Sequence, residues 1–159
     1  MKKMLPMKEY YASLPTKRMG AGCLFFNAAG QILLVKPNYK EGWEIPGGVV
    51  EADESPRLSA QRETFEEIGL QREIGRLLVV DYSDRVVDKS ESLMFIFDGG
   101  VLSEREIDSI VLQAEELDEF IFVGAADLPA PMNSTLARRV RAAWQQLQTP
   151  SDPYMENQE

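Results

Sequence analysis

The chain has 159 residues, of which 44% are hydrophobic and 27% are charged, a composition typical of one globular domain with a sizeable core. Its formal net charge of −9 argues against nucleic acid or an anionic membrane as a partner. It contains no histidine, which excludes Ser-His and Cys-His nucleophilic catalysis and any histidine-ligated zinc site. Acid-base chemistry must therefore use carboxylates, Lys, Tyr, Cys or metal-bound water.

Cysteine usage and the N-terminal sequence indicate where the protein works. The single cysteine, Cys23, cannot form an intramolecular disulfide, so a reducing compartment fits. The start MKKMLPMKEYY lacks the continuous apolar run of a signal peptide, and no stretch approaches the length of a membrane span. We expect a cytoplasmic protein.

Residues 1–17 read as an N-terminal arm, with two prolines and the aromatic pair Tyr10-Tyr11. We expect this arm to pack on the domain or on the second subunit of a homodimer; a partly ordered terminus is the alternative. The domain itself is expected to span residues 18–148, and residues 149–159 are expected to form a flexible, disordered tail.

The first half of the domain predicts a hairpin followed by a glycine-containing loop. Apolar runs over 19–26 and 31–36 flank a turn at 27–30, and Cys23 in the first strand reads as a small core residue. A short apolar strand is expected at 43–46. Gly47 and Gly48 follow it and permit close backbone approach to a ligand.

The clearest local signal is a helix between Ser55 and Gly69. Ser55 is a suitable N-cap, Pro56 suits the first helical position, and Gly69 is a typical C-terminal residue. Helical spacing places Glu63, Glu66 and Glu67 within roughly a third of the circumference. The stripe expected to be buried consists of Leu58, Phe65 and Ile68.

The second half predicts further strands and one more long helix. Strands are expected within 71–82, at 92–97, weakly at 104–113 and at 120–123, with a turn at 98–100 and a helical turn at 125–128. Asn133 or Ser134 is expected to cap a helix to about Leu147, its apolar positions being Leu136, Val140, Ala143 and Leu147. Arg138, Arg139 and Arg141 read as a solvated face. The pattern favours a mixed sheet with helices on both sides, an α+β or α/β sandwich.

The three glutamates of the first helix carry like charges that repel one another at neutral pH. A divalent cation would relieve this repulsion, and an all-carboxylate site suits Mg²⁺, Mn²⁺ or Ca²⁺. Bound cations would also let an acidic protein attract an anionic substrate such as a diphosphate.

The stretch also resembles a known motif. Gly48, Glu54 and the run from Arg62 to Leu70 are similar to the Nudix box, G-x5-E-x7-R-E-U-x-E-E-x-G-U, where U is apolar. Every fixed Gly, Glu and Arg is present, and the one departure is Thr64 at an aliphatic position. The alternative reading is a capped amphipathic helix with a solvated acidic face.

The resemblance implies a Nudix-like α/β/α sandwich and a pyrophosphatase-type hydrolase that uses Mg²⁺ or Mn²⁺. It implies that Glu63, Glu66 and Glu67, with the carbonyl of Gly47, hold the metal. It also implies that Arg62 and Glu54 form an organising ion pair, with Gly48 and Gly69 as structural support.

The general base is left open among Glu63, Glu66 and Glu116. Like charges raise the pKa of a glutamate and so favour a base in this cluster. Residues 116–123 resemble the family's late E-x-x-E-x-x-W-V element, with Phe122 at the usual Trp, and this element often brings a Glu to the metals. A solvated acidic loop is the alternative for Glu116.

The resemblance implies a nucleoside diphosphate linked to another moiety as substrate, for instance a nucleoside triphosphate or a nucleotide sugar. Asp84-Arg85 stand where ADP-ribose hydrolases tend to carry a proline, which disfavours ADP-ribose. Residues that could contact a base or phosphate are Phe25, Tyr39, Tyr82, Arg85 and Phe95.

Two other functions compete with hydrolysis. Isoprenoid diphosphate isomerases share the fold but use a cysteine and an altered box, whereas this box is intact and Cys23 precedes it. A non-catalytic sensor of a nucleotide metabolite would tend to lose box glutamates that this chain keeps.

Overall fold

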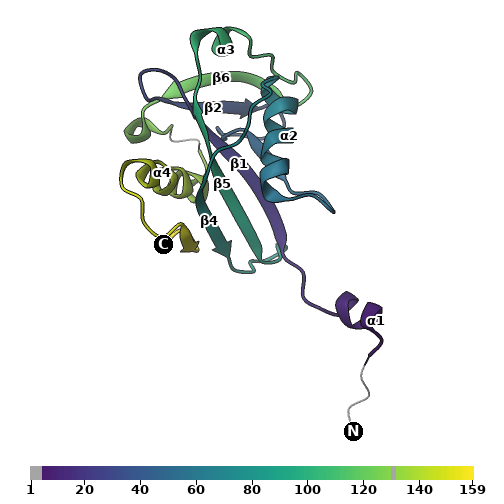
Figure 1. Ribbon diagram of the computed structural model, residues 1–159. Helices are drawn as coiled ribbons and strands as arrows, with labels where there is room; N and C mark the ends of the chain where they lie inside the picture. The colour runs from purple at the N-terminus through teal and green to yellow at the C-terminus, as the bar shows by residue number, and fades with distance from the viewer. Residues whose placement is uncertain (1–4, 130–131) are drawn as a thin grey trace.

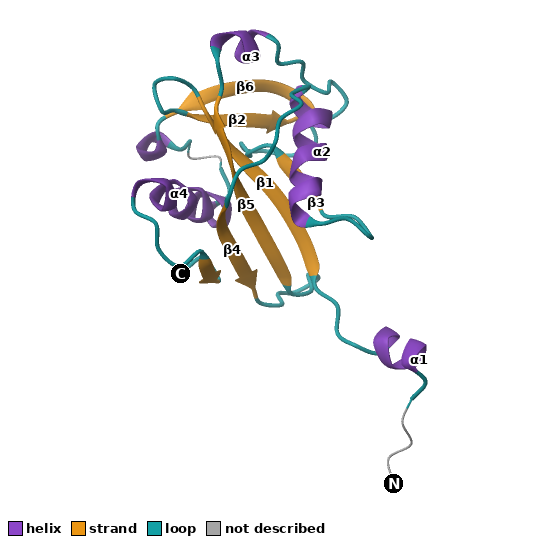
Figure 2. Ribbon diagram, viewed as in Figure 1, coloured by secondary structure: helices purple, strands orange, loops and turns teal. Residues whose placement is uncertain are grey.

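The computed structural model describes residues 5–129 and 132–159, which build a sheet between two main helices (Figures 1 and 2). In chain order the elements are α1 (Met7–Ala12), β1 (Arg18–Phe26), β2 (Ile32–Pro37), β3 (Gly47–Val49), α2 (Pro56–Ile68), β4 (Leu77–Ser83), β5 (Ser92–Val101), α3 (Glu104–Asp108), β6 (Leu117–Val123), the 3₁₀ turn η1 (Ala125–Asp127), α4 (Ser134–Gln148) and β7 (Tyr154–Glu156).

The sheet has the order β6-β2-β1-β5-β4-β7, and β3 pairs with β1 beside this path. The β1–β5 and β4–β7 pairs are parallel, whereas the other pairs are antiparallel. Helices α2 and α4 cover opposite faces of this sheet (Figure 1). The predicted α/β sandwich with a mixed sheet is thus confirmed.

Alternation along β1 divides the core between the two faces of the sheet. Cys23 and Phe25 belong to the apolar cluster beneath α2, and Leu24 and Phe26 belong to the cluster beneath α4. Cys23 is fully buried, as predicted for a core residue, and burial raises the pKa of its thiol to about 12.

The buried face of α2 differs from the predicted stripe. Ile68 is buried as expected, but Leu58 and Phe65 are 57% and 58% exposed. Small or polar side chains occupy the inner face instead, and they are Ser59, Ala60, Thr64 and Glu67. The hydroxyl of Ser59 donates to the carbonyl of Val49, so the helix approaches β3 too closely for large apolar residues.

Three segments adopt structures other than those predicted. Residues 43–46 make only an isolated bridge, between Glu44 and Val35, and the strand begins at Gly47. Residues 98–100 continue β5 and do not turn. The strand expected at 104–113 is replaced by α3, because Ser103 and Glu106 form a capping box that starts a helix.

Both ends of the chain form short regular elements. Residues 7–12 form α1, which has no buried residue and extends away from the sheet in Figure 1; docking on a second subunit stays a prediction. The predicted disordered tail is wrong for Tyr154–Glu156, which pairs with β4 as β7. The polar composition of this segment gave no sign of a strand, since the edge of β4 supplies the pairing.

Among the described residues, no helix has the length and apolarity needed to cross a membrane.

Candidate functional site

Helix α2 is fixed at both ends by contacts that its sequence predicts. The Ser55 side chain accepts a hydrogen bond from the backbone N–H of Leu58, and Pro56 occupies the first turn. Gly69 ends the helix in the left-handed conformation, with φ of 73°. Backbone N–H groups of Val111 and Gln113 then donate to the carbonyls of Ile68 and Glu67, which joins the segment before β6 to the helix end.

Arg62 is the centre of the ionic contacts on α2. Its Nε and Nη2 donate to the two carboxylate oxygens of Glu54, at 2.9 and 3.0 Å. Its Nη1 donates to Glu63 at 2.8 Å and to Glu66 at 2.9 Å, and Nη2 also reaches the carbonyl of Val49. One guanidinium therefore joins the loop before α2 to two glutamates of the helix. These hydrogen bonds lower the pKa of Glu54 to about 2.

Glu63 lies directly against the backbone of Gly48. A Cβ atom added at position 48 would overlap the Glu63 carboxylate, so this contact requires glycine. Burial is the main cause of the raised pKa of Glu63; the hydrogen bond from Arg62 opposes it, and the charges of Glu66 and Glu116 add to it.

Glu67 is the most deeply buried acid of the helix, at 8% exposure. Its carboxylate accepts a hydrogen bond of 2.8 Å from the backbone N–H of Gly47. Burial raises the pKa of Glu67 to about 8 against that hydrogen bond, and the charges of Glu63, Glu44 and Glu116 raise it further.

The charges of Glu63 and Glu116 both contribute to the raised pKa of Glu67, and the charge of Glu116 also contributes to that of Glu63. Glu116 comes from the turn before β6, where its carbonyl accepts from the N–H of Asn38 at 2.8 Å. Glu66 is directed outward: its side chain is 48% exposed and bonded to Arg62. Within residues 5–129 and 132–159, no three His, Cys, Asp or Glu side chains form a ready metal cage.

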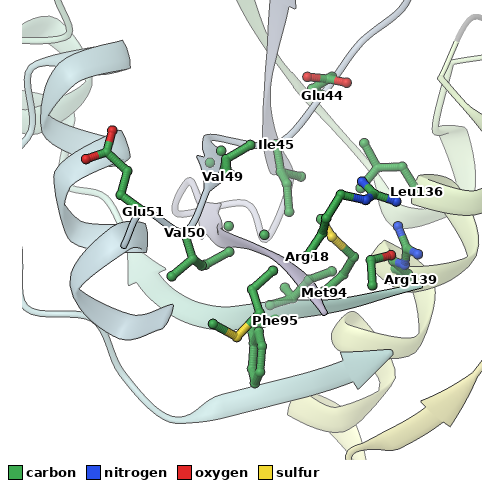
Figure 3. A pocket seen from close by; sticks show the side chains of 18 of the residues that line it. Arg18, Glu44, Ile45, Val49, Val50, Glu51, Met94, Phe95, Leu136 and Arg139 are labelled. Atoms are coloured by element: carbon green, nitrogen blue, oxygen red, sulfur yellow. The ribbon is translucent and has the colours of Figure 1, made fainter. Parts of the chain in front are cut away.

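A cleft of about 650 Å³ adjoins this cluster at Gly47 and Gly48 (Figure 3). It is bounded by β1, β5, the loop from Tyr39 to Ile45, and the N-terminal half of α4. Its apolar side chains include Ile45, Met94 and Leu136. The glutamates of α2 do not line this cleft, so the two glycines form the boundary between the carboxylates and the cavity.

Of the residues predicted to contact a base or phosphate, Tyr39 and Phe95 line the cleft. Phe25 does not, because it is fully buried in the core. Tyr82 lies outside the cleft lining and donates its hydroxyl to Glu91, and Arg85 belongs to a separate hollow at residues 85–90.

The sequence analysis did not predict the positions of two residues that line the cleft. Glu44 lines the cleft and pairs with Lys40 at 2.7 Å, but nothing in its local pattern signals this position. Arg139 was predicted on a solvated face; it is 8% exposed, lines the cleft and pairs with Asp81. Its spacing from Leu136 and Ala143, three and four residues, places it on the apolar face of α4 and could have indicated burial.

Comparison with known proteins identifies the family. A family model described as the NUDIX domain matches residues 16–144. The chain belongs to the Nudix family. Diphosphoinositol polyphosphate phosphohydrolase 2 of Rattus norvegicus is 41% identical over 69 residues, which are 41% of this chain and 38% of that protein. Diphosphoinositol polyphosphate phosphohydrolase 3-alpha of Mus musculus is 34% identical over 93 residues, which are 57% of this chain and 56% of that protein.

Solved structures of other Nudix proteins share the fold. A MutT protein from Methanosarcina mazei Go1 has a TM-score of 0.69 and 21% identity, with 86% of this chain and 99% of that chain covered. A UDP-X diphosphatase has a TM-score of 0.73 and 21% identity, with 96% of this chain and 76% of that chain covered. The sequence matches to these two curated relatives cover less than two thirds of each relative's length. The structural match to the M. mazei protein covers almost all of that chain.

Proposed function

We propose that this Nudix protein is a divalent-cation-dependent hydrolase that cleaves the diphosphate of a nucleoside diphosphate linked to another moiety. The observation that carries the proposal is the position of the Glu67 carboxylate. This carboxylate is buried among the charges of Glu63, Glu44 and Glu116, next to the glycine boundary of a cleft. An acid in such surroundings is a candidate for metal binding or proton transfer.

The donor set fits a hard cation, because its side-chain donors are carboxylates. Glu63, Glu66 and Glu67, with the carbonyl of Gly47, would hold Mg²⁺ or Mn²⁺. When bound, such a cation neutralises charge on a diphosphate and makes an attacking water more acidic. Arg62 already occupies oxygens of Glu63 and Glu66, so it sets where these carboxylates point.

The chain's own groups supply the proton acceptor for hydrolysis. A water oxygen attacks one phosphorus of the diphosphate, the bridging P–O bond breaks, and the leaving phosphate keeps the bonding electrons. The proton of that water passes to a carboxylate. Glu63 and Glu116 are the favoured acceptors, since Glu63 has a raised pKa and Glu116 lies within electrostatic reach of it; Glu66, half exposed, is the third candidate.

The cleft supports a nucleoside as the part of the substrate that adjoins the diphosphate. Tyr39, Ile45 and Leu136 offer apolar surface of the kind that accepts a nucleobase or sugar. The similar proteins are described as acting on, or bound to, diphosphate compounds: diphosphoinositol polyphosphates, UDP-X and ADP ribose. All three support a diphosphate as the shared feature, and UDP-X and ADP ribose support a nucleotide as the moiety held in the cleft.

A thermal shift assay tests metal binding separately from turnover. We expect Mg²⁺ or Mn²⁺ to raise the melting temperature of the wild type and to leave the melting temperature of Glu67→Gln unchanged. Hydrolysis is then measured with ADP-ribose, UDP-glucose, dGTP and a diphosphoinositol polyphosphate, each with cation and with excess chelator. Cation-dependent nucleotide binding without any cleavage would favour the sensor alternative instead.

A further inference from the structure

The C-terminal segment returns to the sheet and contacts a buried acid. Asp81 of β4 is fully buried, and its carboxylate accepts hydrogen bonds from the backbone N–H of Gln158 at 2.9 Å and from Gln158 Nε2 at 3.1 Å. The N–H of Asn157 also donates to the carbonyl of Tyr82 at 2.7 Å. The segment after β7 is therefore bound to β4 by specific polar contacts.

The same acid holds Arg139 in the wall of the cleft. Arg139 Nε donates to Asp81 at 2.6 Å, and Arg139 Nη2 donates to the Ser83 hydroxyl at 2.8 Å. Gln158 Nε2 contacts that hydroxyl as well, at 3.3 Å. Figure 3 shows Arg139 beside Arg18 and Leu136 at one end of the cleft.

In this arrangement, two of the three guanidinium nitrogens of Arg139 already donate hydrogen bonds to the protein. A guanidinium is planar and rigid, so fixing Nε and Nη2 also fixes the direction of Nη1. Among the described residues, Nη1 makes no hydrogen bond to the protein, and Arg139 lines the cleft. Nη1 is thus the guanidinium nitrogen left to donate to an occupant of the cleft that Arg139 lines.

We infer that Arg139 hydrogen-bonds an acceptor oxygen of the bound nucleotide, and that the C-terminal segment positions it through Gln158 and Asp81. The inference rests on the proposed function, because it takes a nucleotide as the occupant of the cleft. Asp81 and Gln158 touch no substrate and are positioning residues. Docking of the C-terminal segment then determines how tightly the cleft binds its ligand.

A purely structural ion pair is the competing explanation, and a matched set of variants separates the two. Arg139→Gln alone would leave Asp81 buried without its cation, so it is combined with Asp81→Asn, which keeps a neutral hydrogen-bonding pair. Asp81→Asn alone keeps the guanidinium but removes the anion that fixes it, so it should bind more weakly than wild type. Arg141→Gln is the control, because Arg141 lies on α4 but is exposed and outside the cleft lining.

The measurement is the Kd by calorimetry, with Mg²⁺, for the α,β-methylene analogues of ADP, UDP and dGTP. We expect the double variant to bind the tightest analogue about tenfold more weakly than wild type, the loss typical of one hydrogen bond to a charged group. Arg141→Gln should stay within about twofold of wild type. Gln158→Ala, which keeps the guanidinium, should weaken binding about threefold.

Wild-type affinity in the double variant would overturn the role of Arg139. A wild-type Kd in Gln158→Ala would overturn the positioning by the C-terminal segment, even if its melting temperature falls. Wild-type protein that binds none of the analogues would also overturn the inference. Cleavage of the natural nucleotides is scored separately, so binding without cleavage would contradict only the proposed hydrolysis.

Discussion

Replacing Arg62 with alanine removes the cation that joins Glu54, Glu63 and Glu66. Hydrogen bonds to charged groups each contribute about 1.5–3 kcal/mol, and Glu54 loses two while Glu63 loses one. The bond to half-exposed Glu66 adds little because water screens it. Water also reaches the site partially, so we expect Arg62→Ala to cost about 3 kcal/mol, or a fall in melting temperature of roughly 10 °C.

The stability loss in Arg62→Ala should depend on pH, and this dependence tests whether the loss comes from the contact with Glu54. The folded-state pKa of Glu54 is lowered to about 2 by Arg62. Its contribution to stability is therefore present above the unfolded pKa, near 4.5, and is lost as the pH falls toward 2. The difference in unfolding free energy between wild type and Arg62→Ala, measured by urea titration, should be largest at pH 7 and shrink below about pH 4.5.

Arg62→Lys is the matched control, because it keeps the charge but cannot make the two-pronged contact with Glu54. It should recover about half of the lost stability. An unchanged melting temperature in Arg62→Ala, or a loss that does not vary with pH, would refute the organising role of Arg62.

The remaining predictions concern the buried acid and the glycine beside it. Glu67→Gln should lower kcat by at least about a hundredfold with the circular dichroism spectrum preserved, and near-normal kcat would remove Glu67 from the site. Because burial raises the pKa of Glu67 to about 8, the metal-free wild type should lose stability as the pH rises from about 4.5 through 8. Urea titrations at pH 5, 7 and 8.5 check this, and a slope that persists in Glu67→Gln would contradict it. Gly48→Ala should displace the Glu63 carboxylate and lower kcat; unchanged kcat would show that no such displacement occurs.

Signals that depend on neighbouring residues were predictable from the sequence. Ser55, Pro56 and Gly69 delimit α2, and Asn133 begins α4, because caps and terminators act within one turn of the helix. The candidate site was predicted for the same reason. Arg62, Glu63 and Glu67 lie within one helix, so their common surface follows from helical geometry.

Features that depend on distant segments were not predictable. Leu58 and Phe65 have the spacing of a buried stripe, yet close packing against β3 selects small residues for the inner face of α2. Arg139 is buried only because Asp81, on another element, compensates its charge. Likewise, β7 forms because β4 offers an open edge, which no pattern within the polar tail reveals.

Release of product from a panel of diphosphate compounds tests the central claim most directly. The panel comprises nucleoside triphosphates, ADP-ribose, nucleotide sugars, dinucleoside polyphosphates and a diphosphoinositol polyphosphate, each with Mg²⁺, with Mn²⁺ and with excess chelator. We predict cleavage of one class that requires the cation and is lost in Glu67→Gln. Cleavage that persists in the chelator, or an absence of cleavage across the whole panel, would contradict the proposed activity.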